Sequence, residues 1–90
     1  MAKVIFSSAL KIYTQNVASC EISGNTIRDV VFQLGQEYPD LKSRLLKEDG
    51  TLRRFMAIFV DDKNICLLEG DQTPVSADSV IRLLPPVGGG

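Results

Sequence analysis

Residues 26–39 read TIRDVVFQLGQEYP, and this stretch predicts the helix that decides the fold. Thr26 followed three residues later by Asp29 resembles a capping box, with Asp in place of the usual Glu or Gln. Pro39 disfavours helical geometry at the residue before it, so the helix should end near Tyr38. The apolar residues recur at the spacing of one helical face: Ile27, Val30, Val31, Leu34 and Tyr38.

Strand-like segments lie on both sides of this helix. Before it, Val4–Phe6 and Val17–Ile22 are predicted to form a hairpin with a loose turn near residues 13–16. The segments expected after the helix are a short helical turn at 41–47, a surface loop at 47–54, strands at 55–60, 65–68 and 80–84, and a turn at 61–64. This order predicts an α+β protein of the β-grasp type, in which one main helix covers one face of a mixed sheet of four to five strands.

The composition limits what the chain can do. Its 90 residues form one small domain with no room for a separate catalytic half. Ten Lys and Arg against 11 Asp and Glu give a net charge of -1, which argues against nucleic-acid binding. The sequence contains no His, the commonest general base and metal ligand. We therefore expect no catalysis by this chain alone, no bound cofactor and no metal site.

The apolar runs and the cysteines indicate a cytoplasmic protein. The longest unbroken apolar run, Phe55–Val60, is far shorter than the ~20 residues of a membrane helix, and we identify no targeting segment. We therefore expect no membrane partner. Cys20 and Cys66 lie far apart without metal-ligand spacing. They are expected to be two buried free thiols in a reducing compartment, with a disulfide left open.

After the last predicted strand the sequence reads PPVGGG, residues 85–90. Proline donates no hydrogen bond to a sheet, so the chain should leave the sheet near Leu84. We expect residues 1–84 to form the domain and residues 85–90 a flexible tail of roughly 20 Å when extended. A phosphate-binding glycine loop needs a following helix, which this stretch lacks. On composition alone, a terminus without a function remains the alternative.

The strand at 80–84 and the tail that follows it, in a β-grasp element order with Asp78 in the preceding turn, resemble the ubiquitin-like sulfur carriers. This family includes the small subunit of molybdopterin synthase and the carrier of the thiamine pathway. The resemblance covers essentially the whole chain and implies a ubiquitin-like β-grasp fold. Residues 52–55 and 58–62 resemble carriers for cysteine or homocysteine synthesis, whereas the tail is closer to the molybdopterin type. The pathway is therefore left open between these two types.

The resemblance also implies a reaction at the end of the tail. In such carriers an E1-like enzyme uses ATP and Mg²⁺ to adenylate the terminal glycine carboxylate, which becomes a thiocarboxylate and donates sulfur. Gly90 would carry this carboxylate, with Gly88 and Gly89 before it, or Gly89 would carry it if a metallopeptidase removes Gly90. The sulfur acceptor would be a biosynthetic enzyme, either a PLP-dependent enzyme or the large subunit of molybdopterin synthase.

Alternation along the last strand predicts a docking surface beside the tail. If Arg82 faces outward, Ile81 and Leu83 face the helix and Leu84 faces outward. On the neighbouring strand, the resemblance places Met56, Ile58 and Val60 inward. The expected partner-binding residues are Phe55, Phe59, Arg82, Leu84, Pro85, Pro86 and Val87. The alternative is that Phe55 and Phe59 belong to the core and no patch exists, because large aromatic side chains dominate small cores.

Three functions remain open on the sequence. The leading interpretation is a sulfur carrier, which is a protein cosubstrate and no enzyme. The second is a ubiquitin-like modifier, in which a lysine amine of a target captures the same activated carboxylate. The third is an adaptor domain that uses the sheet surface and ignores the tail. Deletion of Gly89 and Gly90 would abolish the first two functions and leave the third intact.

Overall fold

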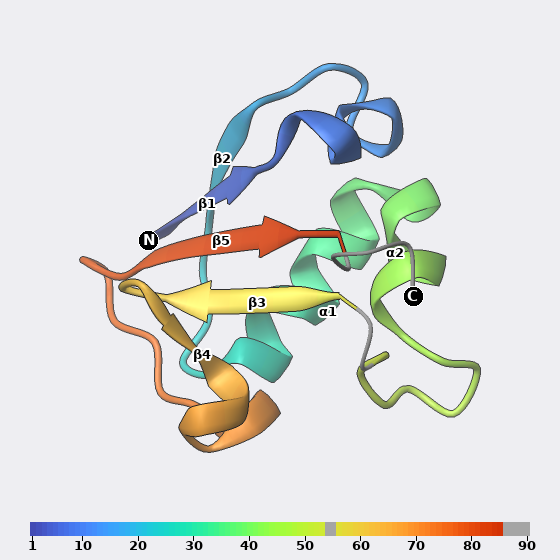
Figure 1. The fold of residues 1–90 in the computed structure, drawn as a ribbon. Coiled ribbons are helices and arrows are strands. Elements are labelled where there is room, and N and C mark those ends of the chain that lie inside the picture. The colour runs from blue at the N-terminus through green and yellow to red at the C-terminus, as the bar shows by residue number, and fades with distance from the viewer. Residues whose placement is uncertain (54–55, 86–90) are drawn as a thin grey trace.

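A computed structural model describes residues 1–53 and 56–85 of the chain, which are built around a mixed sheet (Figure 1). The sheet order is β2-β1-β5-β3-β4. Strands β1 and β5 are parallel, and the other neighbouring pairs are antiparallel. The strands are β1 (Ala2–Phe6), β2 (Ser19–Ile22), β3 (Ala57–Val60), β4 (Lys63–Asn64) and β5 (Val80–Leu84).

Two helices, α1 (Ile27–Glu37) and α2 (Pro39–Leu45), lie on one face of the sheet (Figure 1). The predicted capping box is confirmed: the Asp29 N–H donates to Thr26 Oγ1 at 3.3 Å, and the Thr26 N–H donates to the Asp29 carboxylate at 3.3 Å. Pro39 ends α1 and starts α2, because proline is well tolerated at the first helical position. No helix in the described part of the chain is long and apolar enough to cross a membrane.

The core lies between the sheet and α1. Every second residue of β5 is buried, which confirms that Ile81 and Leu83 face the helices. Met56, Ile58 and Val60 are also buried, as predicted. The residues that contribute least surface to solvent come from all layers: Val4, Ile27, Val30, Val31, Leu34, Leu41, Leu45, Ile81 and Leu83. Burial of each such aliphatic side chain stabilises the fold by about 1.5–3 kcal/mol.

The fourth strand differs from its prediction. A strand was expected at residues 65–68, but β4 ends at Asn64, and Ile65–Leu67 form a 3₁₀ helix. The chain reverses more tightly than expected, because Asp61 and Asp62 both have positive φ, at 49° and 70°. Such a two-residue turn places the residues that flank it directly opposite each other, so the returning strand begins at once.

The connection between β1 and β2 contains more structure than a loose turn. Residues Ser8–Tyr13 form a 3₁₀ helix. The turn expected near residues 13–16 is confirmed, with positive φ at Gln15 and Asn16. Strand β2 begins at Ser19, two residues later than the alternation predicted. The hairpin itself is confirmed by the antiparallel register of β1 and β2.

Candidate functional site

The end of β5 fixes where the tail begins. Strand β5 lies between β1 and β3, with a neighbour on each side. Near the end of β5, the Leu83 carbonyl accepts a hydrogen bond from the Ser7 N–H at 3.2 Å. Pro85 is the last residue that the structure describes at this end. The other tail residues that were predicted to react or to bind lie outside the described residues: Pro86, Val87, Gly88, Gly89 and Gly90.

Figure 1 shows that one face of the sheet lies opposite the helices. The predicted docking residues lie on this face, near the end of β5. Phe59 on β3 pairs with Arg82 on β5, and Ala57 pairs with Leu84. Phe59 is half-buried, Arg82 is exposed and Leu84 is 38% exposed. We call Phe59, Arg82 and Leu84 the sheet patch. Their predicted outward orientation is confirmed, which excludes the core alternative for Phe59, whereas Phe55 lies outside the described residues.

Arg82 gives the sheet patch a positive charge at its centre. It lies between Phe59 on one side and Ile5 of β1 on the other. Its Nε lies 3.7 Å from the Asp62 carboxylate, in an exposed ion pair that contributes little stability. Because the arginine stem can lie along its apolar neighbours while the guanidinium stays in water, the patch offers both apolar area and a cation.

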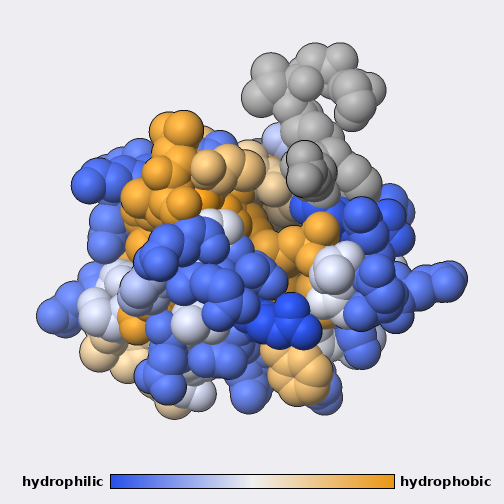
Figure 2. All heavy atoms as spheres, turned by 90° about the horizontal axis from the view of Figure 1, so that it is seen from below, coloured by the Kyte–Doolittle hydropathy of each residue, from blue (hydrophilic) through white to orange (hydrophobic). Residues whose placement is uncertain are grey.

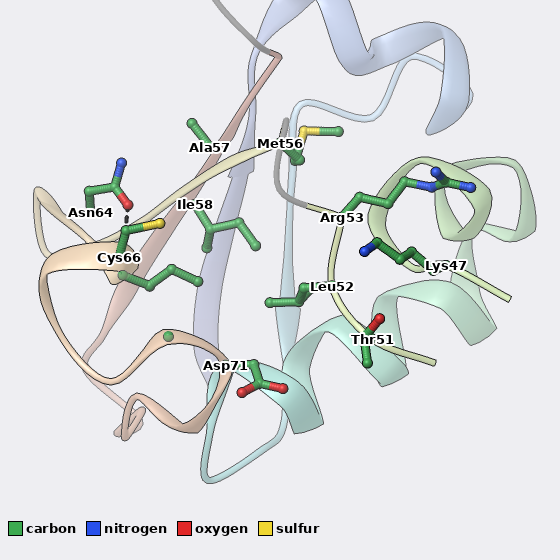
Figure 3. A pocket seen from close by; sticks show the side chains of 12 residues that line it. Lys47, Thr51, Leu52, Arg53, Met56, Ala57, Ile58, Asn64, Cys66 and Asp71 are labelled. Carbon is green, nitrogen blue, oxygen red and sulfur yellow. Dashed lines mark hydrogen bonds between the residues drawn. The ribbon is translucent and has the colours of Figure 1, made fainter. Parts of the chain in front are cut away.

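A groove of about 910 Å³ lies beside the start of β3, between two turns (Figure 3). One wall comes from residues 46–53 and the other from residues 64–71. No sequence pattern indicated this groove, because its two walls are turns that only the folded chain brings face to face. The lining residues are Lys47, Thr51, Leu52, Arg53, Met56, Ala57, Ile58, Asn64, Ile65, Cys66, Gly70 and Asp71.

The two cysteines are free thiols in different surroundings. Cys20 is half-buried; burial raises the pKa of its thiol, while a hydrogen bond with Tyr38 opposes that shift. The prediction of two buried thiols is wrong for Cys66, which is exposed. It belongs to the 3₁₀ helix that replaces the expected fourth strand, and this helix lies at the surface. No group of three His, Cys, Asp or Glu side chains in residues 1–53 and 56–85 could hold a metal ion.

The sequence of this chain is similar to the sequences of known proteins. The profile of the ThiS family matches residues 5–90, which is nearly the whole chain. The chain belongs to the ThiS family. This ThiS-family chain is also 29% identical to the sulfur carrier protein CysO of Mycobacterium tuberculosis over 89 residues. The alignment covers 97% of this chain and 96% of that CysO, so the similarity includes the tail region as well as the domain.

Solved structures confirm the ubiquitin-like β-grasp fold of this ThiS-family chain. The complex of BexX and CysO from Amycolatopsis orientalis contains a chain that matches it with a TM-score of 0.88 and 27% identity, covering 100% of both chains. The small archaeal modifier protein SAMP1 from Methanosarcina acetivorans matches with a TM-score of 0.89 and 28% identity, covering 99% of this chain and 95% of SAMP1. One relative is named as a carrier and the other as a modifier, so both leading interpretations of the sequence have a structural relative.

Proposed function

We propose that this ThiS-family chain is a sulfur carrier whose terminal glycine carboxylate is adenylated and then converted to a thiocarboxylate. The observation that carries this proposal is the match to CysO over nearly the full length of both proteins. The glycine tail that follows the central strand β5 supports it. The chain acts as a cosubstrate and supplies no catalytic group. Its sequence contains no His, the commonest general base.

The chemistry explains why a partner enzyme is needed. The terminal carboxyl group has a reference pKa near ~3.3–3.7, so it is ionised at neutral pH and is a poor electrophile. An E1-like enzyme would join it to the AMP portion of ATP with release of pyrophosphate, using Mg²⁺. Sulfide then displaces AMP, which replaces one carboxylate oxygen by sulfur. Glycine residues lack a Cβ, so the tail can enter a narrow active site.

The likeness to CysO favours an acceptor of the cysteine type, such as a PLP-dependent enzyme, over the large subunit of molybdopterin synthase. The reactive residue is Gly90, or Gly89 if a metallopeptidase first removes Gly90. We place the reaction in the cytoplasm, because it needs ATP and a reducing environment in which thiols persist.

The folded domain must supply most of the affinity for the activating enzyme. Ordering a flexible tail costs about 1–2 kcal/mol per residue in backbone entropy, and small glycine residues offer few contacts to offset this cost. Apolar anchors carry most of the energy of a typical interface. We therefore assign the docking to the sheet patch, which lies at the root of the tail. The other residues that we expect to bind the partner are Phe55, Pro85, Pro86 and Val87.

Replacement of Leu84 or Phe59 by Glu is expected to weaken binding to the activating enzyme by about tenfold or more, because it removes an apolar anchor of at least ~1.4 kcal/mol. The free energy of unfolding should change little, since both side chains face away from the core. Binding can be measured by calorimetric titration and unfolding by denaturant melts. Phe32→Glu is a matched control, because Phe32 is 56% exposed on α1. If Phe59→Glu unfolds the domain, Phe59 is a core residue and the sheet patch is wrongly drawn.

The proposed function is tested by incubating the chain with the E1-like enzyme of its host, ATP, Mg²⁺ and a sulfide source. Intact mass spectrometry should show one oxygen-to-sulfur exchange, located at the last residue by fragmentation. The likeness to SAMP1 makes the modifier the second candidate. Conjugates to lysine amines in place of the thiocarboxylate would establish the modifier. Absence of any activation would leave the adaptor function.

A further inference from the structure

One buried hydroxyl lies beside the root of the tail without a hydrogen-bond partner. Ser7 Oγ is the one buried side-chain oxygen or nitrogen in residues 1–53 and 56–85 that has no partner. Ser7 follows β1 directly, and its N–H donates to the Leu83 carbonyl at 3.2 Å. A buried hydroxyl without a partner has given up its hydrogen bonds to water and gained none, which costs free energy. Such an atom in a folded protein calls for an explanation.

Helix capping does not explain the serine at this position. Ser7 precedes the 3₁₀ helix Ser8–Tyr13, where a serine side chain usually accepts a hydrogen bond from an N–H of the first turn. The Ser7 side chain makes no such bond. The Leu10 N–H donates instead to the main-chain carbonyl of Ser7, at 3.0 Å. The fold therefore uses both main-chain groups of Ser7 and leaves its hydroxyl unused.

The hydrogen-bonding pattern of β1 and β5 points to a possible acceptor. In a parallel pair, every second carbonyl of one strand faces the other strand. Beside β1 this series contains the carbonyls of Ser79 and Leu83. They accept hydrogen bonds from the N–H groups of Lys3 and Ser7, at 3.1 and 3.2 Å. The next carbonyl of the series belongs to Pro85, so the alternation directs it toward the end of β1, where Ser7 lies.

The Pro85 carbonyl has no main-chain partner that could continue this series. The chain turns into the 3₁₀ helix Ser8–Tyr13 after β1, so no further N–H group follows along β5 (Figure 1). Within the part of the chain that the structure describes, no hydrogen bond involves Pro85. Proline also lacks an N–H group of its own. The root of the tail therefore offers a free acceptor beside the strand end that holds a free donor.

The groove beside the start of β3 contains no comparable atom. Hydrophobic side chains gather around a hollow in Figure 2. Among the described residues that line the groove, no side chain has a buried polar atom without a partner. The structure therefore points to Ser7, and away from the groove, as the place where a contact is missing.

We propose that Ser7 is a positioning residue for activation, whose hydroxyl donates a hydrogen bond to the Pro85 carbonyl when the activating enzyme extends the tail. This role rests on the proposed function. The bond fixes the direction in which the tail leaves β5, so that the terminal carboxylate reaches the nucleotide in the reactive orientation. Small errors in the position of a reacting group lower a rate strongly. In the free chain the hydroxyl is unpaired, and docking supplies the alignment that the bond needs.

Ser7→Ala tests this role in the activation reaction, with the chain as the varied substrate and pyrophosphate release as the signal. We expect kcat to fall about three- to tenfold, because one net hydrogen bond of the reactive complex is lost. The KM for the chain should stay within about twofold, since the sheet patch supplies the docking. Ser7→Thr keeps a hydroxyl at this position and should retain about half of the wild-type kcat or more. Ser8→Ala is the matched control, because Ser8 is the exposed neighbouring serine and should leave both constants unchanged.

Denaturant melts separate this role from a structural one. Ser7→Ala removes a buried hydroxyl that has no partner, so its unfolding midpoint should equal that of the wild-type chain or lie higher. A lower midpoint would show that the hydroxyl already stabilises the free chain, and it would overturn the proposal. An unchanged kcat for Ser7→Ala would overturn it as well, and so would an equally large loss in a stably folded Ser7→Thr.

The wild-type chain in the same assay distinguishes this role from the proposed function. If the wild-type chain is not activated at all, the proposed function fails and the role of Ser7 fails with it. If the wild-type chain and Ser7→Ala are activated with the same kcat, the proposed function stands and only the role of Ser7 is refuted.

Discussion

A chain that lacks Gly89 and Gly90 is expected to fold as the full chain does and to gain no sulfur in the activation reaction. The loss should be complete, because the reacting carboxylate is moved two residues back toward the domain and the activating enzyme can no longer reach it. The free energy of unfolding should change by less than ~0.5 kcal/mol, since terminal residues outside the sheet contribute little to stability. Intact mass spectrometry and denaturant melts measure the two quantities on the same sample.

The adaptor function makes the opposite prediction for this truncated chain. An adaptor that uses only the sheet surface would bind its partner unchanged after the deletion. Sulfur gain by the truncated chain, located at Gly88, would show that the length of the tail is not what selects the reacting carboxylate.

Replacement of Leu34 or Leu83 by Ala should destabilise the domain by about 2–5 kcal/mol. Leu34 lies on the buried face of α1 and is 0% exposed, and Leu83 lies on the inner face of β5 and is 1% exposed. A small domain has a total stability of only about 5–15 kcal/mol, so either variant loses a large part of it. The cost combines the lost burial of the side chain with the cavity that it leaves. Denaturant melts monitored by circular dichroism give the difference in unfolding free energy.

Leu84→Ala is the matched control for these core variants. It makes the same substitution on the residue after Leu83, but its side chain is 38% exposed on the other face of the sheet. The change should cost well under half as much as Leu83→Ala. Similar costs for the two variants, or less than ~1 kcal/mol for both Leu34→Ala and Leu83→Ala, would mean that the core is not where the structure places it.

The elements that the sequence predicted well are those whose signals are local. Helix α1 combines an apolar stripe with a capping box, and Pro39 marks its end. The inner and outer faces of β5 followed from Arg82, because a single charged residue in an apolar strand indicates which side meets water. The orientation of Phe59 needed the family resemblance as well, since β3 is apolar at every position.

The prediction of a strand at residues 65–68 is wrong, because the polar residue before this segment, Asn64, changes the backbone conformation. Asn64 accepts a hydrogen bond from the Cys66 N–H and starts a 3₁₀ helix, so Ile65 is buried while Leu67 is 83% exposed. An apolar run alone cannot distinguish this outcome from a strand. The groove could not be predicted for a related reason: its two walls are hydrogen-bonded turns that only the sheet and helices bring together.

The central claim, that the chain carries sulfur on its terminal glycine, is tested most directly by intact mass spectrometry of the protein recovered from its native host. This measurement reports the mature end of the tail, any thiocarboxylate and any covalent adduct in the same spectrum. The sulfur-carrier function predicts a fraction of the chain heavier by one oxygen-to-sulfur exchange at Gly90, or at Gly89 after trimming. Chains joined through that glycine to lysine residues of other proteins, with no thiocarboxylate form, would contradict it.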